Sequence, residues 1–500
     1  MPSPNVLLVC TDHWPGSLLG CAGHPAVLTP TLDQLAINGR RFANAYSECP
    51  VCVPARRTLM TGLTPHSHGM LSNTGDEGWP PPPLPETPTI AEAFRDAGYQ
   101  TSAVGKMHWQ PQRQRRGFEE LLLDEEGRGR EGIRADDYEL YLGDNGHPGE
   151  RFAGGMSNNN YMWRAWHLEE RLHATNWTAR QMSRQIVRRD PTRPGFWYCS
   201  FSHPHPPLNP LQAYLDLYRD ILPPEPVVAE WIKGDPAALP PALQRELQGL
   251  HDRCCDFSPA QIRDILRAFY ALCTHIDHQL RVVIGTLKDE GLLGNTIICF
   301  TSDHGDMLGN HRMWAKHWMY EGSNNVPMIL AGTDEQKRNG RVGHHLEDNR
   351  LVATRDIMPT LLDLAGGEIP AHCEGMSMVG EAQRESLFGA HGSLKVAENG
   401  NQHRMIRTAT HKLVYYPVGN LIQLFDMETD REERHDLSGD PAQAETLARM
   451  SGRLIEALPE SERAAWVTNG KLTGRPDEGP NPPAPNTWFD GQRGLHWPSK

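Results

Sequence analysis

The sequence predicts an α/β fold in which a doubly wound, mostly parallel sheet is joined to a smaller C-terminal subdomain with an antiparallel sheet and a helix. Over the first 390 residues, short apolar runs alternate with amphipathic patterns of helical period, the order expected of parallel strands covered by helices. After that point short alternating runs favour antiparallel strands. The 500 residues also exceed the usual size of one core, so a second unit is expected.

The large domain is expected over residues 1–390. Its strand-like runs end in polar residues, and helical patterns separate them. Strands are predicted in NVLLVC (5–10), GFWYCSF (195–201) and NTIICF (295–300), and helices in TPTLDQLAING (29–39), TPTIAEAFRDAG (87–98) and the long segment 259–291. Pro-rich 77–88 and Gly/Asn-rich 149–163 are expected to be loops over the edge of the sheet.

The small subdomain is expected over 391–470. Two segments of alternating pattern, 403–417 and 420–430, predict antiparallel strands, and ETLARMSGRLIEAL (445–458) predicts a covering helix. Residues 471–500 are rich in Pro and Gly and are expected to form an extended tail. Because such tails often wrap a neighbouring subunit, a homo-oligomer is expected.

Composition argues against two classes of partner. There are 62 Asp and Glu against 49 Lys and Arg, without a dense basic stripe, which argues against nucleic acid. The N-terminal apolar run lacks a charged region or cleavage site, and no segment reaches the ~20 apolar residues that span a bilayer. The expectation is a cytoplasmic protein away from the membrane, with its ten cysteines mostly reduced.

Polar side chains that follow separate strands are the first sign of a functional site. Asp12 follows the first predicted strand, His205 follows the second, and Asp303 follows the third. In open α/β sheets ligands bind beyond the carboxyl ends of the strands. These three side chains are therefore expected to converge on one site.

The segment CPVCVPARRTLMTG, residues 49–62, is compatible with three chemistries. A C-x-x-C pair before a helix suits a thiol redox pair, because the helix lowers the pKa of the first thiol. Half of a zinc site would need a second pair at suitable spacing, and Cys254 and Cys255 are adjacent. In the third interpretation, Pro54 begins a helix and Gly62 caps it, so that Cys52 is a nucleophile at an anion-binding helix N-terminus.

The residues Cys52-Val53-Pro54-Ala55-Arg56 with Thr61-Gly62 resemble the C-x-P-x-R…T-G motif of the type I sulfatases, members of the alkaline phosphatase superfamily. Other blocks resemble the family in the same order: Gly105-Lys106-Met107-His108, Pro204-His205-Pro206-Pro207, Ser302-Asp303-His304-Gly305-Asp306, and Lys316 within MWAKHWMYEGSNNVP. The chain is identified as a member over roughly residues 5 to 440. This resemblance implies an alkaline phosphatase-like fold and hydrolysis of a small-molecule sulfate ester.

The resemblance also implies a mechanism. Cys52 is converted to formylglycine by a formylglycine-generating enzyme, and Cys49 is a bystander. Arg56, Lys106 and His108 hold the formylglycine hydrate and the sulfate oxygens, and Asp303 can accept the proton of the nucleophile; His205 and Lys316 bind sulfate and protonate the leaving group. Lys106 and His108 alternate along a segment expected to be extended, so they should point to the same face.

A divalent cation is expected at the same place. Asp12, Asp303 and His304 can converge on it together with the group derived from Cys52, and carboxylates favour calcium or magnesium. The resemblance implies Ca²⁺, whereas the imidazole of His304, where many sulfatases have asparagine, also admits Mn²⁺. His13 stands where many sulfatases have a second carboxylate, and whether it is a ligand stays open.

The segments GKMHW, SFSHPHPP and SDHGDMLG with WAKHW most resemble the choline-sulfatase-like branch. Its quaternary ammonium substrate can be held by aromatic faces and carboxylates, and the candidate contacts are Asn73, Trp109, and Trp488 and Asp490 of the tail. Residues 125–195 resemble little of that branch, so sugar and aryl sulfates stay open. The rival functions are a formylglycine-dependent phosphonate monoester or phosphodiester hydrolase, and a noncatalytic sulfated-ligand-binding or thiol redox protein.

Overall fold

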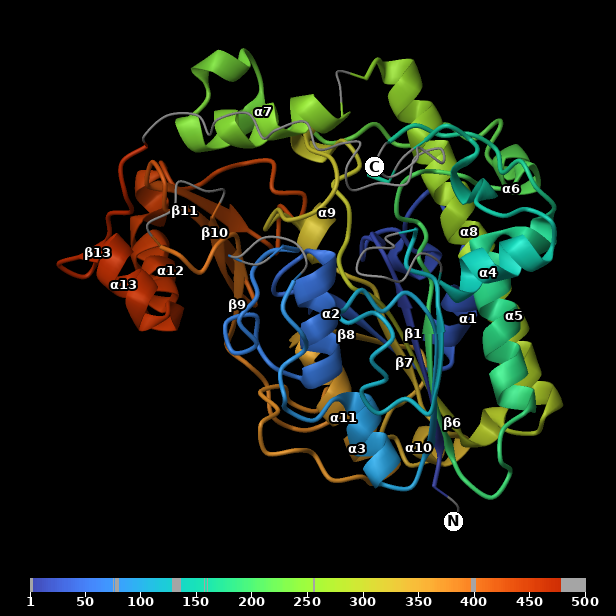
Figure 1. The fold of residues 1–500 in the computed structure, drawn as a ribbon. Helices are drawn as coiled ribbons and strands as arrows, with labels where there is room; N and C mark the ends of the chain where they lie inside the picture. Colours follow the sequence, from blue (N-terminus) through green and yellow to red (C-terminus); the bar gives the residue numbers. More distant parts are fainter. Residues whose placement is uncertain are drawn as a thin grey trace.

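The computed structural model describes residues 3–74, 76, 81–127, 136–156, 158–159, 161–254 (the backbone alone for 248–254), 257–396 and 402–477. Its large domain contains an eight-stranded sheet in the order β4-β3-β5-β1-β6-β7-β2-β8, and only β7 runs antiparallel to its neighbours (Figure 1). The predicted fold class is therefore confirmed. The strands are β1 Asn5–Thr11, β2 Arg40–Tyr46, β3 Gln100–Gly105, β4 Glu120–Leu123, β5 Gly195–Ser200, β6 Thr296–Ser302, β7 Met328–Ala331 and β8 Leu346–Ala353.

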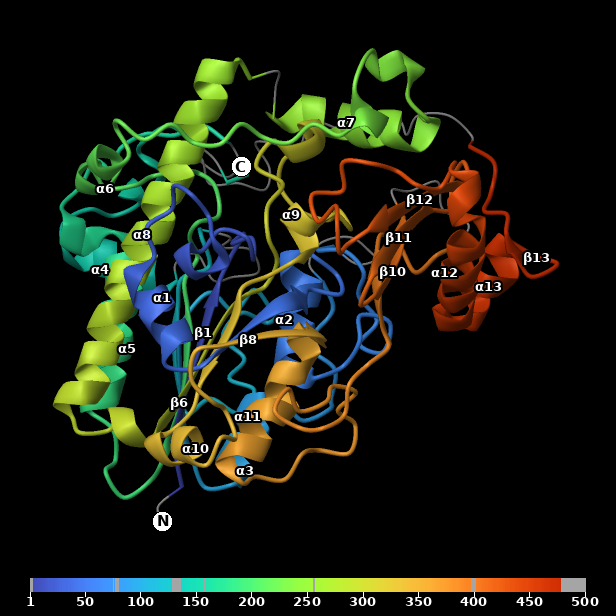
Figure 2. The same ribbon diagram turned by 180° about the vertical axis from the view of Figure 1, so that it is seen from behind.

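Helices cover both faces of this sheet, as Figures 1 and 2 show from opposite sides. One face carries α1 Pro30–Ile37, α5 Ala174–Val187 and α8 Pro259–Asp289, and the other carries α2 Cys52–Thr61, α3 Ile90–Asp96 and α11 Ile357–Ala365. The remaining α-helices of the large domain are α4 Asp137–Asp144, α6 Gln212–Leu217, α7 Pro241–Cys254, α9 Glu321–Asn324 and α10 Asp334–Arg338. No helix in the described part of the chain is both long and apolar enough to cross a membrane.

The central strands are apolar throughout because both of their faces are covered. Every residue of β1 is buried, and β1 pairs in parallel with β5 on one side and β6 on the other. The long helix α8 begins with a capping box formed by Ser258 and Gln261. Further along α8, the buried carboxylate of Asp277 accepts hydrogen bonds from the backbone N–H groups of Thr31 and Leu32, at 3.0 and 2.8 Å, which fixes the start of α1.

The small subdomain packs beside the part of the large domain that contains α2 (Figure 1). Its antiparallel sheet has the order β12-β11-β10-β9 and already begins at Ser386, before the predicted boundary at 391. Its elements are β9 Ser386–His391, β10 His403–Thr408, β11 His411–Tyr416, β12 Leu421–Asp426, α12 Ala444–Ala457, α13 Glu460–Trp466, and a hairpin of β13 Val467–Thr468 and β14 Lys471–Leu472. The division of the chain at 390 and 470 stays a prediction.

The start of the predicted tail takes part in this hairpin, and residues 478–500, with Trp488 and Asp490, lie outside the described residues. Parts of the two predicted loops, 77–88 and 149–163, lie outside them as well. The expected role of the tail in a homo-oligomer stays a prediction.

A buried ion pair ties α13 to the small sheet, and Glu462→Gln is expected to lower the stability by about 3 kcal/mol at neutral pH. Burial alone would raise the pKa of Glu462, but the charge and hydrogen bond of Arg404, helped by His66, lower it from 4.5 to about 2. A carboxylate whose pKa is lowered in the folded state contributes stability above its ordinary pKa and loses that contribution as the pH falls toward 2. Urea unfolding of both proteins from pH 7 to pH 3 should show the difference shrinking below pH 4.5; a constant difference would contradict an ionic contribution.

Candidate active site

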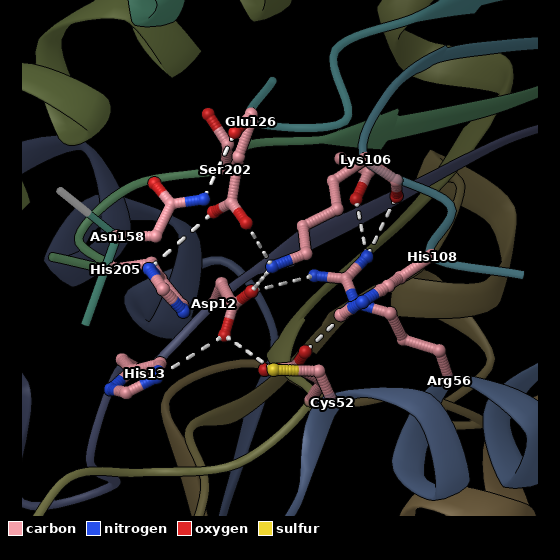
Figure 3. A network of polar contacts seen from close by, with 12 residues as sticks. Asp12, His13, Cys52, Arg56, Lys106, His108, Glu126, Asn158, Ser202 and His205 are labelled. Atoms are coloured by element: carbon pink, nitrogen blue, oxygen red, sulfur yellow. Dashed lines mark hydrogen bonds and ion pairs between the residues drawn. The ribbon is translucent and has the colours of Figure 1, made fainter. Parts of the chain in front are cut away.

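The predicted acidic and imidazole side chains follow three strands that end at the same edge of the large sheet. Asp12 follows β1 and Asp303 follows β6, and the register that pairs Thr11 with Ser302 sets their carboxylates side by side. His205 follows β5, on the other side of β1. All three side chains are almost completely buried. Figure 3 shows Asp12 between His205 and Cys52.

The nucleophile candidate is the first residue of α2. The prediction placed Cys52 just before the helix, whereas the structure has Val51 as the N-cap and Cys52 as the first helical residue; Gly62 closes the helix with φ of 68°, as predicted. The side-chain oxygen of Asn73 accepts a hydrogen bond from the Val53 N–H, at 2.9 Å. Asn73 therefore satisfies one of the N–H groups that a helix N-terminus leaves unpaired.

The two cysteines of the C-x-x-C pair have opposite environments. Burial and Asp12 raise the pKa of Cys52, but the charges of Lys316, Lys106 and His304 outweigh them and lower it from 9.0 to about 7. Burial raises the pKa of Cys49, and its Sγ lies 3.4 Å from the Leu71 carbonyl oxygen. Only Cys52 thus has the electropositive surroundings of a reactive thiol.

Asp12, Cys52, Asp303 and His304 form a compact group of possible metal ligands, with one donor atom of each within 4.8 Å of the others. Nε2 of His304 lies 3.2 Å from Cys52 Sγ, 3.3 Å from Asp12 Oδ1 and 3.6 Å from Asp303 Oδ1. Ligands bound at about 2.0–2.4 Å from one ion are roughly 3–3.5 Å apart. The donor set therefore fits a single divalent cation.

The imidazole of His304 is oriented for this role. Its Nδ1 donates to the Gly305 carbonyl oxygen at 2.8 Å, which directs Nε2 toward the group. A backbone carbonyl on the far nitrogen is the usual support of a metal-binding histidine. This contact distinguishes His304 from a histidine that only fills space in the core.

Arg56 and Lys106 place positive charge beside the carboxylates of Asp12 and Asp303. Arg56 donates through Nε to Asp303 Oδ2 and through Nη1 to Ser200 Oγ, both at 2.8 Å. Lys106 Nζ contacts Asp12 and donates to Glu126 Oε2 at 2.8 Å. Burial would raise the pKa of Asp12, but Lys106 and its other positive neighbours hold it well below its usual range. The carboxylate of Asp12 therefore stays ionised although it is fully buried.

Lys316 also contacts the candidate nucleophile, Cys52. Its Nζ lies 2.7 Å from Cys52 Sγ and donates to His13 Nε2 at 2.9 Å. His13 in turn donates from Nδ1 to Asp306 Oδ2, at 2.6 Å, and the Tyr161 hydroxyl contacts the same carboxylate. His13 also belongs to a second possible ligand group, with Asp12, Cys52 and His205.

The structure corrects the reason given for pairing Lys106 with His108. The strand β3 ends at Gly105, where a Cβ would lie 1.7 Å from the Ser200 carbonyl oxygen, and His108 has φ of 58°. The backbone N–H groups of Met107 and His108 both donate to Glu125 Oε1, at 2.9 and 3.0 Å. The segment after Gly105 is therefore irregular rather than a continuing strand, although both side chains lie in the cluster (Figure 3).

The structure does not bring Trp109 into this cluster. Its ring is 2% exposed and packs in the core near Phe118, and its Nε1 donates to the Gln114 carbonyl oxygen at 3.1 Å. A substrate contact of Trp109 or of Asn73, whose side chain caps α2, stays a prediction.

Sequence reasoning missed several residues of the site. The carboxylate of Glu126 contacts Lys106, and its Oε1 lies 3.6 Å from His205 Nδ1. The backbone carbonyl oxygen of Glu126 accepts a hydrogen bond from Asn158 at 3.0 Å. The signal was present, because Asp124-Glu125-Glu126 follow the apolar run of β4 in the way that Asp12 follows β1. No comparable pattern marks Asn158 or Tyr161.

Comparisons with known proteins agree with this geometry. The chain matches the family model described as Sulfatase over residues 4–367, and one described as N-sulphoglucosamine sulphohydrolase, C-terminal, over residues 309–460. It is 32% identical to an arylsulfatase of Clostridium perfringens, over 95% of this chain and 98% of that protein. It is 30% identical to a choline-sulfatase of Rhizobium meliloti, over 93% of this chain and 90% of that protein.

Among solved structures, the phosphonate monoester hydrolase of Agrobacterium radiobacter is similar with a TM-score of 0.76 and 25% identity, over 94% of this chain and 99% of that chain. Its similarity extends over the small subdomain as well as the large domain. The chain therefore belongs to the sulfatase family, has the fold of the alkaline phosphatase superfamily, and is a sulfuric ester hydrolase.

Proposed function

We propose that this enzyme hydrolyses a small-molecule sulfate monoester with a formylglycine derived from Cys52 and a divalent metal ion. The observation that carries the proposal is the position of Cys52, which begins α2 and contacts His304, Asp12 and Lys316 in one buried cluster. A bystander cysteine would not need two carboxylates and several cationic groups around its sulfur.

The metal would be held by Asp12, Asp303, His304 and the modified residue 52. Two carboxylates make the donor set hard enough for Ca²⁺ or Mg²⁺, and the imidazole admits Mn²⁺. When bound, the ion supplies positive charge that offsets the charge of the sulfate oxygens and favours an ionised nucleophile. The resemblance to the type I sulfatases supports Ca²⁺.

The chain's own residues would divide the remaining work. Arg56, Lys106 and His108 surround the sulfate oxygens with positive charge and hydrogen-bond donors, which a transition state with growing negative charge requires. Asp303 is placed to hold the proton that the nucleophile loses. Lys316 and His205 are placed to give the leaving oxygen a proton, which is required because charge develops there as the S–O bond breaks.

A hydrated formylglycine supplies one hydroxyl group to attack sulfur and a second from which a base can remove a proton, so that sulfate leaves and the aldehyde returns. An ordinary serine ester has no such exit. The formylglycine-generating enzyme is accordingly the partner proposed for this chain.

Mass spectrometry of the tryptic peptide that contains Cys52 tests the proposal without a choice of substrate. Conversion of the thiol to the aldehyde removes about 18 Da, and the loss should map to Cys52 in protein from the native host. An unmodified thiol in that protein would contradict the hydrolytic mechanism and favour the binding or redox interpretation.

The phosphonate or phosphodiester hydrolase remains the second candidate, because the phosphonate monoester hydrolase of Agrobacterium radiobacter is similar over 94% of this chain. Lys106 favours the sulfatase, since the resemblance gives the rival class no second lysine here. We expect kcat/KM to be larger for a nitrophenyl sulfate than for the matched phosphate diester and phosphonate ester. A much larger value for the diester would overturn the assignment. Which sulfate ester is the natural substrate is left to a screen of choline, sugar and aryl sulfates.

A further inference from the structure

We propose that His403 of the small subdomain, held by Glu246 of α7, is a positioning residue for Lys316. The inference rests on the proposed function, in which the Lys316 amine protonates the leaving oxygen. In this arrangement the small subdomain contributes to the reaction by fixing the backbone next to Lys316, without touching the substrate.

The backbone on both sides of Lys316 has a conformation that its own residues disfavour. Ala315 and His317, on either side of it, have φ of 64° and 79°, in the left-handed region that is unfavourable for residues with a Cβ. Such a conformation persists only where surrounding contacts impose it. The place of the Lys316 amine therefore depends on what holds its two neighbours.

Both sides of Lys316 are fixed by hydrogen bonds from other segments. Before it, the Ala315 N–H donates to Asp306 Oδ1 at 3.1 Å. After it, the His317 N–H donates to the Pro50 carbonyl oxygen at 2.9 Å, which ties the segment to the chain just before Cys52. The His317 carbonyl oxygen accepts a hydrogen bond from His403 Nδ1 at 3.1 Å.

The ring of His403 is itself fixed by a buried carboxylate. His403 Nε2 lies 2.7 Å from Glu246 Oε1, and both side chains are buried. A carbonyl oxygen can only accept, so His403 Nδ1 is the donor in the hydrogen bond to His317. The other oxygen of Glu246 lies 3.8 Å from His317 Nε2, and the Trp318 ring stacks on His403 with centroids 5.8 Å apart.

These contacts join three separate parts of the fold at one peptide. Glu246 comes from α7, which lies above both the large domain and the small subdomain in Figures 1 and 2, His403 begins β10, and His317 follows the proposed acid. A histidine that only filled the core would not need a carboxyl group on one nitrogen and a strained peptide on the other. Without Glu246, the ring can turn and release the peptide that places Lys316.

The test compares Glu246→Ala with Lys316→Ala over aryl sulfates whose leaving phenols span a wide range of pKa. Poor leaving groups need the proton, whereas an acidic nitrophenol does not. For the poorest leaving group we expect Glu246→Ala to lower kcat about 10- to 100-fold, with little change for the most acidic phenol and in KM. Glu246→Gln keeps a hydrogen-bonding group at the same place and should restore most of the loss.

Glu462→Gln is the matched control, because it disrupts another buried carboxylate pair, with Arg404, one residue further along β10. It should lower the Tm without changing the dependence on the leaving group. If Glu246→Ala lowers kcat equally for all substrates, as a destabilised protein would, the inference is wrong. If kcat of Lys316→Ala still depends more steeply on the pKa of the leaving phenol, the proposed function stands. If Lys316→Ala itself shows no steeper dependence, the proposed role of Lys316 fails and the inference fails with it.

Discussion

Cys52→Ala is expected to lower kcat/KM for a sulfate ester by at least roughly 10,000-fold, the scale of losing a covalent nucleophile. The remaining cations can still bind sulfate, so binding of the inorganic ion should change much less than turnover. Steady-state rates with a nitrophenyl sulfate and isothermal titration with sulfate separate the two effects. A variant that kept more than a hundredth of the activity would mean that residue 52 is not the nucleophile.

Cys49→Ser is the control for this result, and its activity should stay within about threefold of the starting protein, the scale of a substitution outside the reacting groups. Cys49 faces the Leu71 carbonyl oxygen, and burial raises the pKa of its thiol, so it supplies no thiolate to the site. A redox protein would depend on both cysteines. Equal losses in the two variants would therefore support the dithiol interpretation against the hydrolase.

Asp303→Asn is expected to lower kcat about 1,000-fold and to lower the content of bound metal, since the substitution removes a charged group from the proposed metal ligands and the proposed acceptor of the nucleophile's proton. The carboxylate lies 2.8 Å from Arg56 Nε and 3.6 Å from His304 Nε2. The amide keeps the shape of the side chain but leaves the buried charge of Arg56 with less compensation. Elemental analysis of purified protein, with the activity recovered after chelation and added Ca²⁺ or Mn²⁺, measures both effects.

Asp277→Asn provides the comparison for that experiment. Asp277 is another buried aspartate, but it accepts backbone hydrogen bonds from Thr31 and Leu32 at the start of α1. Its replacement should lower the Tm and leave the metal content unchanged. If Asp303→Asn also retained its metal at full stoichiometry, the proposed ligand set would be wrong.

The sequence was sufficient for those parts of the site that depend on local pattern. Apolar runs of seven or fewer residues mark β1, β5 and β6, and polar residues at their ends fall at the same edge of a parallel sheet. Cys52 and Gly62 mark the two ends of α2 because the chemistry of helix ends is local. The strand-end pattern therefore predicted that Asp12, His205 and Asp303 converge, whereas the resemblance to the type I sulfatases added Cys52 to the same site.

The parts that could not be predicted depend on contacts between distant segments. Lys316 contacts His13 across 303 positions of sequence, and no periodic pattern encodes such a pairing. The strand β3 ends at Gly105, where Ser200 comes close, and His108 has a positive φ beside Glu125, so the extended segment predicted from alternation does not continue to His108. The burial of Trp109 in the core could not be predicted either, because it depends on how the surrounding loop folds, which no local pattern shows.

The burial of Cys52 limits when the residue can be modified. The side chain is 0% exposed, and every residue of α2 is buried with it. An enzyme that oxidises Cys52 as proposed must therefore reach it while the chain is still unfolded. The fraction of active protein then depends on the rate of oxidation relative to the rate of folding. A nascent chain that folds before Cys52 is oxidised would be correctly folded and inactive.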